Sequence, residues 1–187
     1  MMPNTMSEPT PIVFRALTIS LGPGSVLDHC IIYTIKYTIS MGAHPYYYFV
    51  EYQPDIEAAL QDLRQREFEA GRYNPVQPFP QFPIRLDAPA PGAKHDSIYE
   101  AIEEAAEDGT RSILDIESVS DWPEFGVASP FPEEDLERHF GTTQPTKEMI
   151  SRKLSFLASV KRGHCVYLTV FDSGQPSELF FGGYSFD

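Results

Sequence analysis

The last part of the chain, 165-CVYLTVFDSGQPSELFFGGY-184, consists of two apolar segments on either side of a turn. Both segments are rich in β-branched and aromatic residues, a composition that favours strands. The four residues Asp172-Ser173-Gly174-Gln175 between them are typical of a tight hairpin connection. The sequence therefore predicts an antiparallel hairpin of residues 165–171 and 178–184, with a bulge at Gly182-Gly183.

A matching strand is predicted near the start of the clearly patterned region, where residues 46–52 read YYYFVEY. Between this strand and the hairpin, apolar residues at helical spacing and capping residues predict helices. These helices span residues 56–70, 98–107, 132–141 and 146–163. Strands at both ends with helices between them predict a single α+β domain, in which the first and last strands meet in a mostly antiparallel sheet with helices packed on one face.

A further strand is predicted over residues 111–119, because apolar and acidic residues alternate there. Leu114 and Ile116 would then lie on a buried face, and Asp115 and Glu117 on a solvated one. A short strand is also expected at residues 125–128.

Charge and composition divide the chain into two parts. Residues 1–40 contain two acidic and two basic residues, so residues 41–187 carry the entire net charge of −13. We expect residues 1–40 to be an N-terminal extension, either an over-extended start or a disordered tail, and residues 41–187 to be the domain. Residues 74–92 are rich in proline and predict an extended strap over its surface.

The overall charge excludes some classes of partner. A net charge of −13 repels phosphate backbones and anionic lipid surfaces, and no compensating basic patch is visible. We therefore expect neither nucleic-acid binding nor membrane binding. No signal-peptide pattern opens the chain, and its two cysteines, Cys30 and Cys165, do not form a metal-binding pair, which favours the cytoplasm.

Three stretches carry a resemblance to other sequences: YYYFVEYQPDIEAALQDLRQREFEAGRYNP from residue 46, GTRSILDIESVSD from residue 109 and ELFFGGYSFD at residues 178–187. Taken together, residues 46–187 resemble a group of uncharacterised bacterial proteins. The resemblance implies a bacterial or phage setting and a start near Met41, and it brings no activity, cofactor or catalytic residue with it.

The candidate catalytic residues are few. Asp115 and Glu117 could supply paired carboxylates for acid–base work or oxygen ligands for a cation, although a solvated strand face is the simpler interpretation. His164 beside Cys165 could indicate an activated thiol, but neighbours on a strand point to opposite faces. No metal-binding or cofactor-binding motif is present, so we expect neither a metal nor a cofactor.

Two surfaces are candidates for partner binding. The first is the proline-rich segment together with a cation and three aromatic rings in or beside it, from Arg72, Tyr73, Phe79 and Phe82. The rings could equally anchor the strap on the protein's own core. The second is the acidic helix that carries Glu103, Glu104 and Glu107, together with the acidic residues 133–135.

These features lead to two hypotheses about function. The first is a non-enzymatic, acidic bacterial interaction protein, similar to an immunity or inhibitor protein, that engages a basic partner. The alternative is a small enzyme that uses Asp115 and Glu117, with or without a metal, in a cleft under the proline-rich strap.

Overall fold

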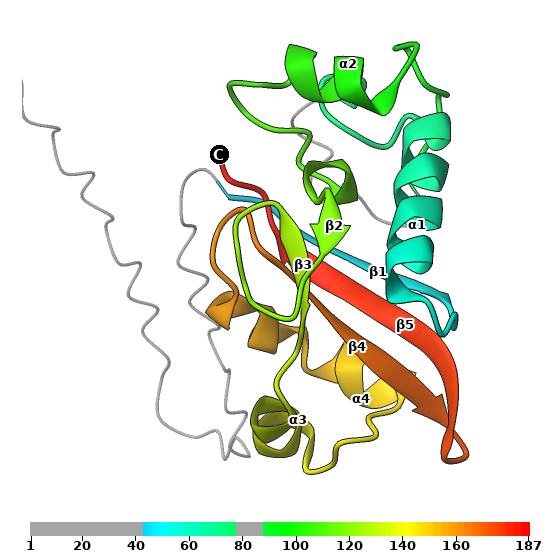
Figure 1. Cartoon of the computed structure of the whole chain (residues 1–187), viewed down its shortest axis with the longest axis vertical. Helices are drawn as coiled ribbons and strands as arrows, with labels where there is room; N and C mark the ends of the chain where they lie inside the picture. Colours follow the sequence, from blue (N-terminus) through cyan, green and yellow to red (C-terminus); the bar gives the residue numbers. More distant parts are fainter. Residues whose placement is uncertain (1–42, 78–87) are drawn as a thin grey trace, which may run out of the picture. The chain divides into compact units, whose positions relative to one another are not determined.

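The computed structural model describes residues 43–77 and 88–187, in which five strands form one mixed sheet (Figure 1). The strand order is β1-β5-β4-β3-β2. The strands are β1 (Pro45–Glu51), β2 (Ser118–Val119), β3 (Val127–Pro130), β4 (Cys165–Asp172) and β5 (Gln175–Tyr184). The predicted extension at residues 1–40 lies outside the described residues. The α+β class is confirmed.

The antiparallel half of the sheet consists of the predicted strands from the two ends of the domain. β5 is central, with Phe181 opposite both Tyr48 of β1 and Tyr167 of β4. The β4–β5 turn is formed by Ser173 and Gly174, whose φ angles of 50° and 76° are both positive, as a type I′ hairpin turn requires. The predicted hairpin and the meeting of first and last strands are confirmed. β2 and β3 add two parallel pairings at the opposite edge from β1.

The glycine pair of β5 is a site of close packing and not the bulge that we predicted. Gly182 and Gly183 keep regular register with both neighbouring strands, and the irregularity lies between Val170 and Phe171 of β4. A Cβ atom on Gly183 would lie 2.3 Å from the main-chain oxygen of His164. The absence of a side chain at Gly183 therefore permits the β4 backbone to pass this closely.

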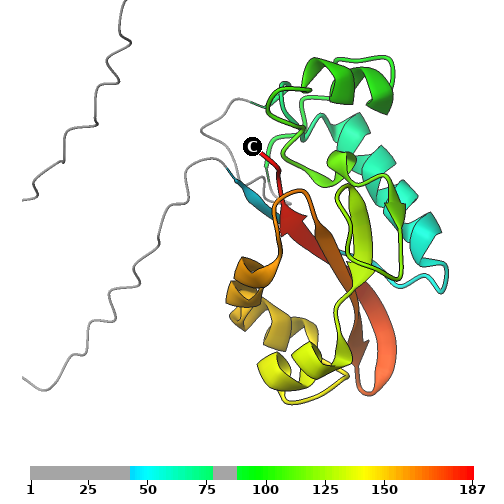
Figure 2. The same ribbon diagram turned by 60° about the vertical axis from the view of Figure 1, so that its left-hand side comes forward.

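Helices cover both faces of the sheet, whereas we expected them on one face (Figure 2). α1 (Ile56–Ala70), α2 (Ile98–Glu104) and the 3-10 helix η2 (Ile113–Asp115) pack with Tyr46, Tyr48 and Phe181 on one face. α3 (Glu133–Phe140), α4 (Lys147–Arg152) and the 3-10 helix η3 (Leu154–Ser159) pack with Leu168, Val170 and Phe180 on the other. Side chains of the inner strands point alternately to the two faces of the sheet, and helices cover both faces. Both sets of side chains are therefore buried, and both faces are apolar.

The first two helices begin at the predicted caps, and α1 also ends at the predicted glycine. Asp55 caps α1 by accepting a hydrogen bond from the Ala58 amide, and Gly71 ends it in a left-handed conformation with φ of 71°. Ser97 caps α2 by accepting from the Glu100 amide. α2 ends at Glu104, before the predicted end at residue 107, and the following turn leads to Gly109.

The predicted helix over residues 146–163 is divided in two. α4 ends at Arg152, and the chain continues as η3. The ring of Phe156, in η3, packs against those of Phe131, Phe140 and Phe180 at centroid distances of 4.9, 5.4 and 5.8 Å. The tighter 3-10 turns allow both Phe156 and Leu157 to be buried.

Candidate functional site

Residues 111–119 do not form the predicted strand but a 3-10 turn followed by the short β2. The Oγ atom of Ser112 accepts a hydrogen bond from the Leu114 amide, and Oδ1 of Asp115 accepts one from the Thr110 amide at 2.8 Å. Arg111 adopts a left-handed conformation with φ of 55°. Hydrogen bonds from side chain to backbone compete with a strand ladder, which explains the difference. Leu114 and Ile116 are buried, as predicted.

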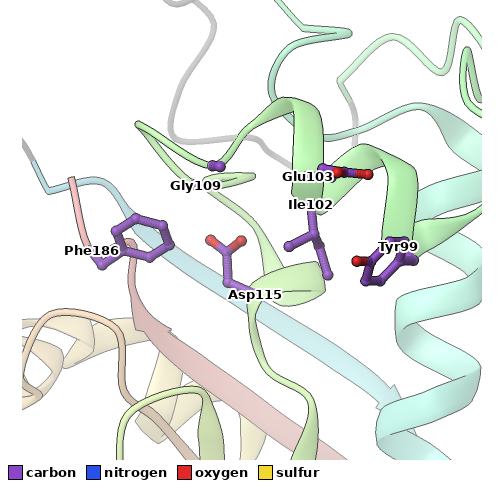
Figure 3. Close-up of a pocket in the computed structure, with 7 residues that line it drawn as sticks. Tyr99, Ile102, Glu103, Gly109, Asp115 and Phe186 are labelled. Carbon is purple, nitrogen blue, oxygen red and sulfur yellow. The ribbon is translucent and has the colours of Figure 1, made fainter.

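This turn places Asp115 in a pocket beneath α2, which we call the Asp115 pocket (Figure 3). Its volume is about 330 Å³. Its lining is mostly apolar and aromatic, and consists of Tyr99, Ile102, Glu103, Ala106, Gly109, Asp115 and Phe186. Figure 3 shows the Asp115 carboxylate directed towards Gly109, with the Phe186 ring on one side and Ile102 and Tyr99 on the other. Two carboxylates, those of Asp115 and Glu103, thus line a mostly apolar hollow.

The two oxygens of Asp115 differ in their surroundings. Oδ1 accepts the hydrogen bond from Thr110, whereas Oδ2 is buried and has no hydrogen-bond partner within the described residues. Burial raises the pKa of the Asp115 carboxyl by more than hydrogen bonds from Thr110 and from the Arg111 main chain lower it, and the negative charge of Asp187 adds to the rise. A buried carboxylate oxygen without a donor costs free energy, so the pocket favours a ligand that donates a hydrogen bond.

The Phe186 wall of the pocket is held by a polar cluster around Asp187. The Asp187 carboxylate accepts a hydrogen bond from Nε of Arg111 at 2.8 Å, and its side chain also accepts one from the Ser185 hydroxyl. The Ser185 amide in turn donates to the main-chain oxygen of His44 at 3.0 Å. Contacts between residues that are distant in sequence therefore hold the C-terminal segment that carries Phe186 beside the pocket.

A second hollow adjoins the Asp115 pocket along α2. Its volume is about 320 Å³, and it is lined by Arg64, Ile98, Tyr99, Ile102 and Glu117. Tyr99 and Ile102 separate the two hollows, so Asp115 and Glu117 line different ones. The two carboxylates that the sequence offers as a candidate pair therefore do not line the same hollow. Instead, the main-chain oxygen of Glu117 accepts a hydrogen bond from Gln61 at 2.8 Å.

The acidic residues expected to form one contact surface lie in two separate places. α2 and α3 lie at opposite ends of the domain and on different faces of the sheet (Figure 1). Around α2, Glu104 is bound to His95, and Asp108 forms an ion pair with Arg111. Glu103 and Glu107 are exposed, and within the described part of the chain their carboxylates form no hydrogen bond or ion pair.

The described residues at the start of the proline-rich segment are held by the protein's own core. Tyr73 is fully buried and stacks on Phe68, and Arg72 forms a bidentate ion pair with the buried Glu67. Both residues therefore anchor the start of the segment on the core and are not available to a partner. Phe79 and Phe82 lie outside the described residues.

A hydrogen-bonded bridge joins this anchor to α2. The Tyr73 hydroxyl lies 2.8 Å from Nδ1 of His95, and Nε2 of His95 lies 2.9 Å from the Glu104 carboxylate. In the neutral tautomer that carries its proton on Nε2, His95 donates to the Glu104 carboxylate and its Nδ1 accepts from the Tyr73 hydroxyl. The bridge ends in the core at Tyr73, which gives it a structural role.

His164 and Cys165 each have a main-chain hydrogen-bond partner and, within the described residues, are not hydrogen-bonded to each other. Cys165 is 1% exposed, and burial raises the pKa of its thiol to about 12. Nδ1 of His164 is hydrogen-bonded to the main-chain oxygen of Arg162 at 2.9 Å. The pair therefore does not form an activated thiol.

A third hollow lies beside β3, with a volume of about 500 Å³. Its walls are formed by prolines and aromatic residues, including Trp122, which is 74% exposed, and by Lys161 and His164 at its edge. Its charged residues are of both signs, namely Asp121, Asp135 and Lys161. This hollow therefore indicates no particular ligand.

No group of three or more histidine, cysteine or acidic side chains within residues 43–77 and 88–187 could hold a metal ion. Across the same residues, every helix is too short or too polar to cross a bilayer.

No protein-family model matches the chain, and no curated protein or solved structure is significantly similar to it. The resemblance of residues 46–187 to uncharacterised bacterial proteins therefore stays a prediction.

The sequence identified Asp115 and Glu103, as parts of different candidate sites, but none of the apolar and aromatic walls of the pocket. Tyr99 and Ile102 were assigned to a helix, and Phe186 was left unassigned. All three are distant from Asp115 in sequence, so no local pattern connects them to it. One signal for Tyr99 was present in the sequence. Tyr99 is two positions before Ala101 on the predicted helix, so the two residues lie on opposite sides of it, and Ala101 is buried. The exposed fraction of Tyr99 is 73%.

Proposed function

We propose that this chain is a non-enzymatic, acidic interaction protein that engages a basic protein partner, in the manner of an immunity or inhibitor protein of the bacterial cytoplasm. The observation that carries the proposal is the surface beside α2. There the exposed Glu103 lines the Asp115 pocket next to the exposed ring of Tyr99, and the exposed Glu107 follows in the turn after α2. We call this the α2 surface.

The composition of the α2 surface is suited to protein recognition. Aromatic residues such as Tyr99 are enriched at interfaces, where a large ring adds contact area at little cost in conformational entropy. Carboxylates at the edge of such a surface accelerate association with a basic partner, and this steering acts over ~10 Å at 0.1 M salt. The chain's net charge of −13 adds to the attraction.

The alternative of a small enzyme has weaker support. Asp115 and Glu117 line different hollows, and neither hollow is lined by a described residue of the proline-rich segment. The raised pKa of Asp115 is a property that catalytic acids share, but a catalytic role would need a second chemical group in the same pocket. Glu103, at the edge of the pocket, is the only other titratable carboxylate among the described lining residues.

The experiment that tests the proposal compares two charge reversals of equal size. One variant carries Glu103→Lys and Glu107→Lys on the α2 surface, and the control carries Glu134→Lys and Glu137→Lys on α3. All four side chains are exposed and outside the side-chain hydrogen bonds and ion pairs of the described residues. The probe is octalysine, a defined basic peptide, with affinity measured by calorimetry at 20 and 200 mM salt.

We expect the α2 variant to lose at least tenfold in affinity at low salt, and the α3 variant to lose less than threefold. Both variants change the net charge by the same amount, so the difference measures the α2 surface and not the overall charge. Equal losses in the two variants would contradict the proposal. Circular dichroism spectra would establish that both variants are folded.

A further inference from the structure

The Asp115 pocket has the features of a site for one cationic side chain. Its walls are two aromatic rings and an aliphatic side chain, from Tyr99, Phe186 and Ile102. Its volume of about 330 Å³ lies at the lower end of the range for ligand pockets, roughly 300–1,000 Å³. The pocket therefore has space for a side chain rather than for a large cofactor.

The charged groups of the pocket are all acidic. Asp115 lies among the apolar walls, and Glu103 lies at the edge beside Tyr99. Neither arginine nor lysine is among the described residues that line it. A cation that enters would find a carboxylate and the faces of aromatic rings, both of which attract positive charge.

The hydrogen bonding of Asp115 distinguishes between cations. Oδ1 already accepts from the Thr110 amide, and Oδ2 alone has no donor. A guanidinium group binds a carboxylate best through two parallel hydrogen bonds, which needs both oxygens. An ammonium group is a point charge that can bind one oxygen, and the four-carbon chain of lysine can lie along apolar walls.

We propose that the Asp115 pocket binds a lysine side chain of the basic partner, with the ammonium group on Oδ2 of Asp115 and the aliphatic chain against Tyr99, Ile102 and Phe186. This inference rests on the proposed function, because it names the residue through which the partner docks on the α2 surface. Oδ2 is buried in the ligand-free chain, so the proposed binding requires the pocket to open locally to admit the ammonium group.

The first test uses n-butylammonium, which has the length and charge of the lysine side chain, in place of a partner. Amide chemical shifts of the full chain are followed by NMR during titration. We expect shifts at Ile102, Gly109 and Phe186, a response at least fivefold weaker to n-butanol, and a weaker response to n-propylguanidinium than to n-butylammonium. Equal responses to n-butanol and n-butylammonium would overturn the proposal.

Two variants make the test specific to the pocket. Asp115→Asn keeps the size of the side chain and the acceptor for Thr110 but removes the charge. Ala106→Phe fills the pocket from its wall, leaves Asp115 in place, and covers the case in which Asp115→Asn does not fold. We expect each variant to weaken n-butylammonium binding at least fivefold. Unchanged binding in either folded variant would overturn the assignment.

The octalysine titration separates this inference from the proposed function. If the α2 charge reversal weakens octalysine binding but Asp115→Asn and Ala106→Phe do not, the proposed function stands and the lysine pocket is wrong. If all of these variants weaken binding more than the α3 control does, both stand. The last outcome is that n-butylammonium binds in the pocket but the α2 and α3 charge reversals weaken octalysine binding equally. The pocket then binds ammonium groups, but the proposed function is wrong. The assignment of the pocket to a lysine of a partner protein is then wrong as well.

Discussion

The carboxylate of Glu67 is fully buried and accepts two hydrogen bonds from the guanidinium group of Arg72, at 2.7 and 2.8 Å. Arg66 also approaches this carboxylate, at 3.2 Å, but its side chain is 47% exposed. Two arginines thus contact one buried charge in different environments, and their removal should have different consequences.

We expect Arg72→Ala to lower the free energy of unfolding by about 3–5 kcal/mol, because it leaves a buried carboxylate without its partner. Arg66→Ala, the matched control, should cost about 1 kcal/mol or less, as exposed ion pairs do. Urea denaturation of both variants measures the difference. Similar losses in the two variants would show that the ion pair with Arg72 does not compensate the buried charge of Glu67.

Asp115 makes stability depend on pH in a predictable direction. Burial raises the pKa of its carboxyl above the ordinary value of 3.8, so the folded chain holds this proton more tightly than the unfolded chain does. The contribution of Asp115 to stability is therefore greatest below the ordinary pKa and is lost as the pH rises through the raised pKa. At neutral pH the ionised carboxylate destabilises the folded chain.

Asp115→Asn should consequently raise the melting temperature at pH 7 and remove this part of the pH dependence. Thermal unfolding from pH 3 to pH 8, compared between the wild-type chain and the variant, measures it. Asp96→Asn is the control, because Asp96 is exposed and its carboxylate makes no contact within the described residues. A melting temperature at pH 7 that falls in Asp115→Asn would contradict the prediction, since the carboxylate would then stabilise the fold.

The affinity for a cation should depend on the same carboxyl group. An ammonium ion binds the ionised form of Asp115, so we expect n-butylammonium affinity to fall as the pH decreases through the raised pKa. The measurement is the NMR titration repeated at pH 7 and pH 4. Affinity that does not change between these values would place the ammonium group away from Asp115.

Cys165 should be unreactive while the chain is folded. Burial raises the pKa of its thiol to about 12, and thiolate is the reactive form. Replacement of Cys30 by serine leaves Cys165 as the single cysteine of the chain. We expect no labelling of this variant by a thiol reagent at pH 8 in buffer, and complete labelling in denaturant. Rapid labelling in buffer would show that β4 opens or that the thiol is accessible.

The strands and helix ends were predictable where local chemistry decides the structure. The type I′ turn at Ser173 and Gly174 and the caps of α1 are set by residues within a few positions of one another. The turn at residues 111–115 was not predictable in the same way. The alternation there is typical of a strand, but Thr110, Ser112 and Asp115 form a local hydrogen-bond network that the pattern does not reveal.

The candidate site depends on contacts that no local pattern encodes. Asp115 was selected for its charge, yet its pocket exists because Phe186 is held beside it by the contact between Asp187 and Arg111. The burial of Tyr73 and Arg72 was also not predictable, because the same residues are suited to an exposed surface and to an anchor on the core. Long-range packing decides between these outcomes.

The position of β5 between β1 and β4 has a consequence for the way in which the chain folds. β4 and β5 are neighbours in sequence and can pair at once, but β1 joins them across a separation that places Pro45 opposite Tyr184. Closing so long a loop delays the pairing, and folding slows as contacts become less local. Until β1 arrives, the apolar edge of β5 is open to strands of other molecules. We therefore expect dilute conditions to favour refolding, and competition from aggregation to grow with protein concentration.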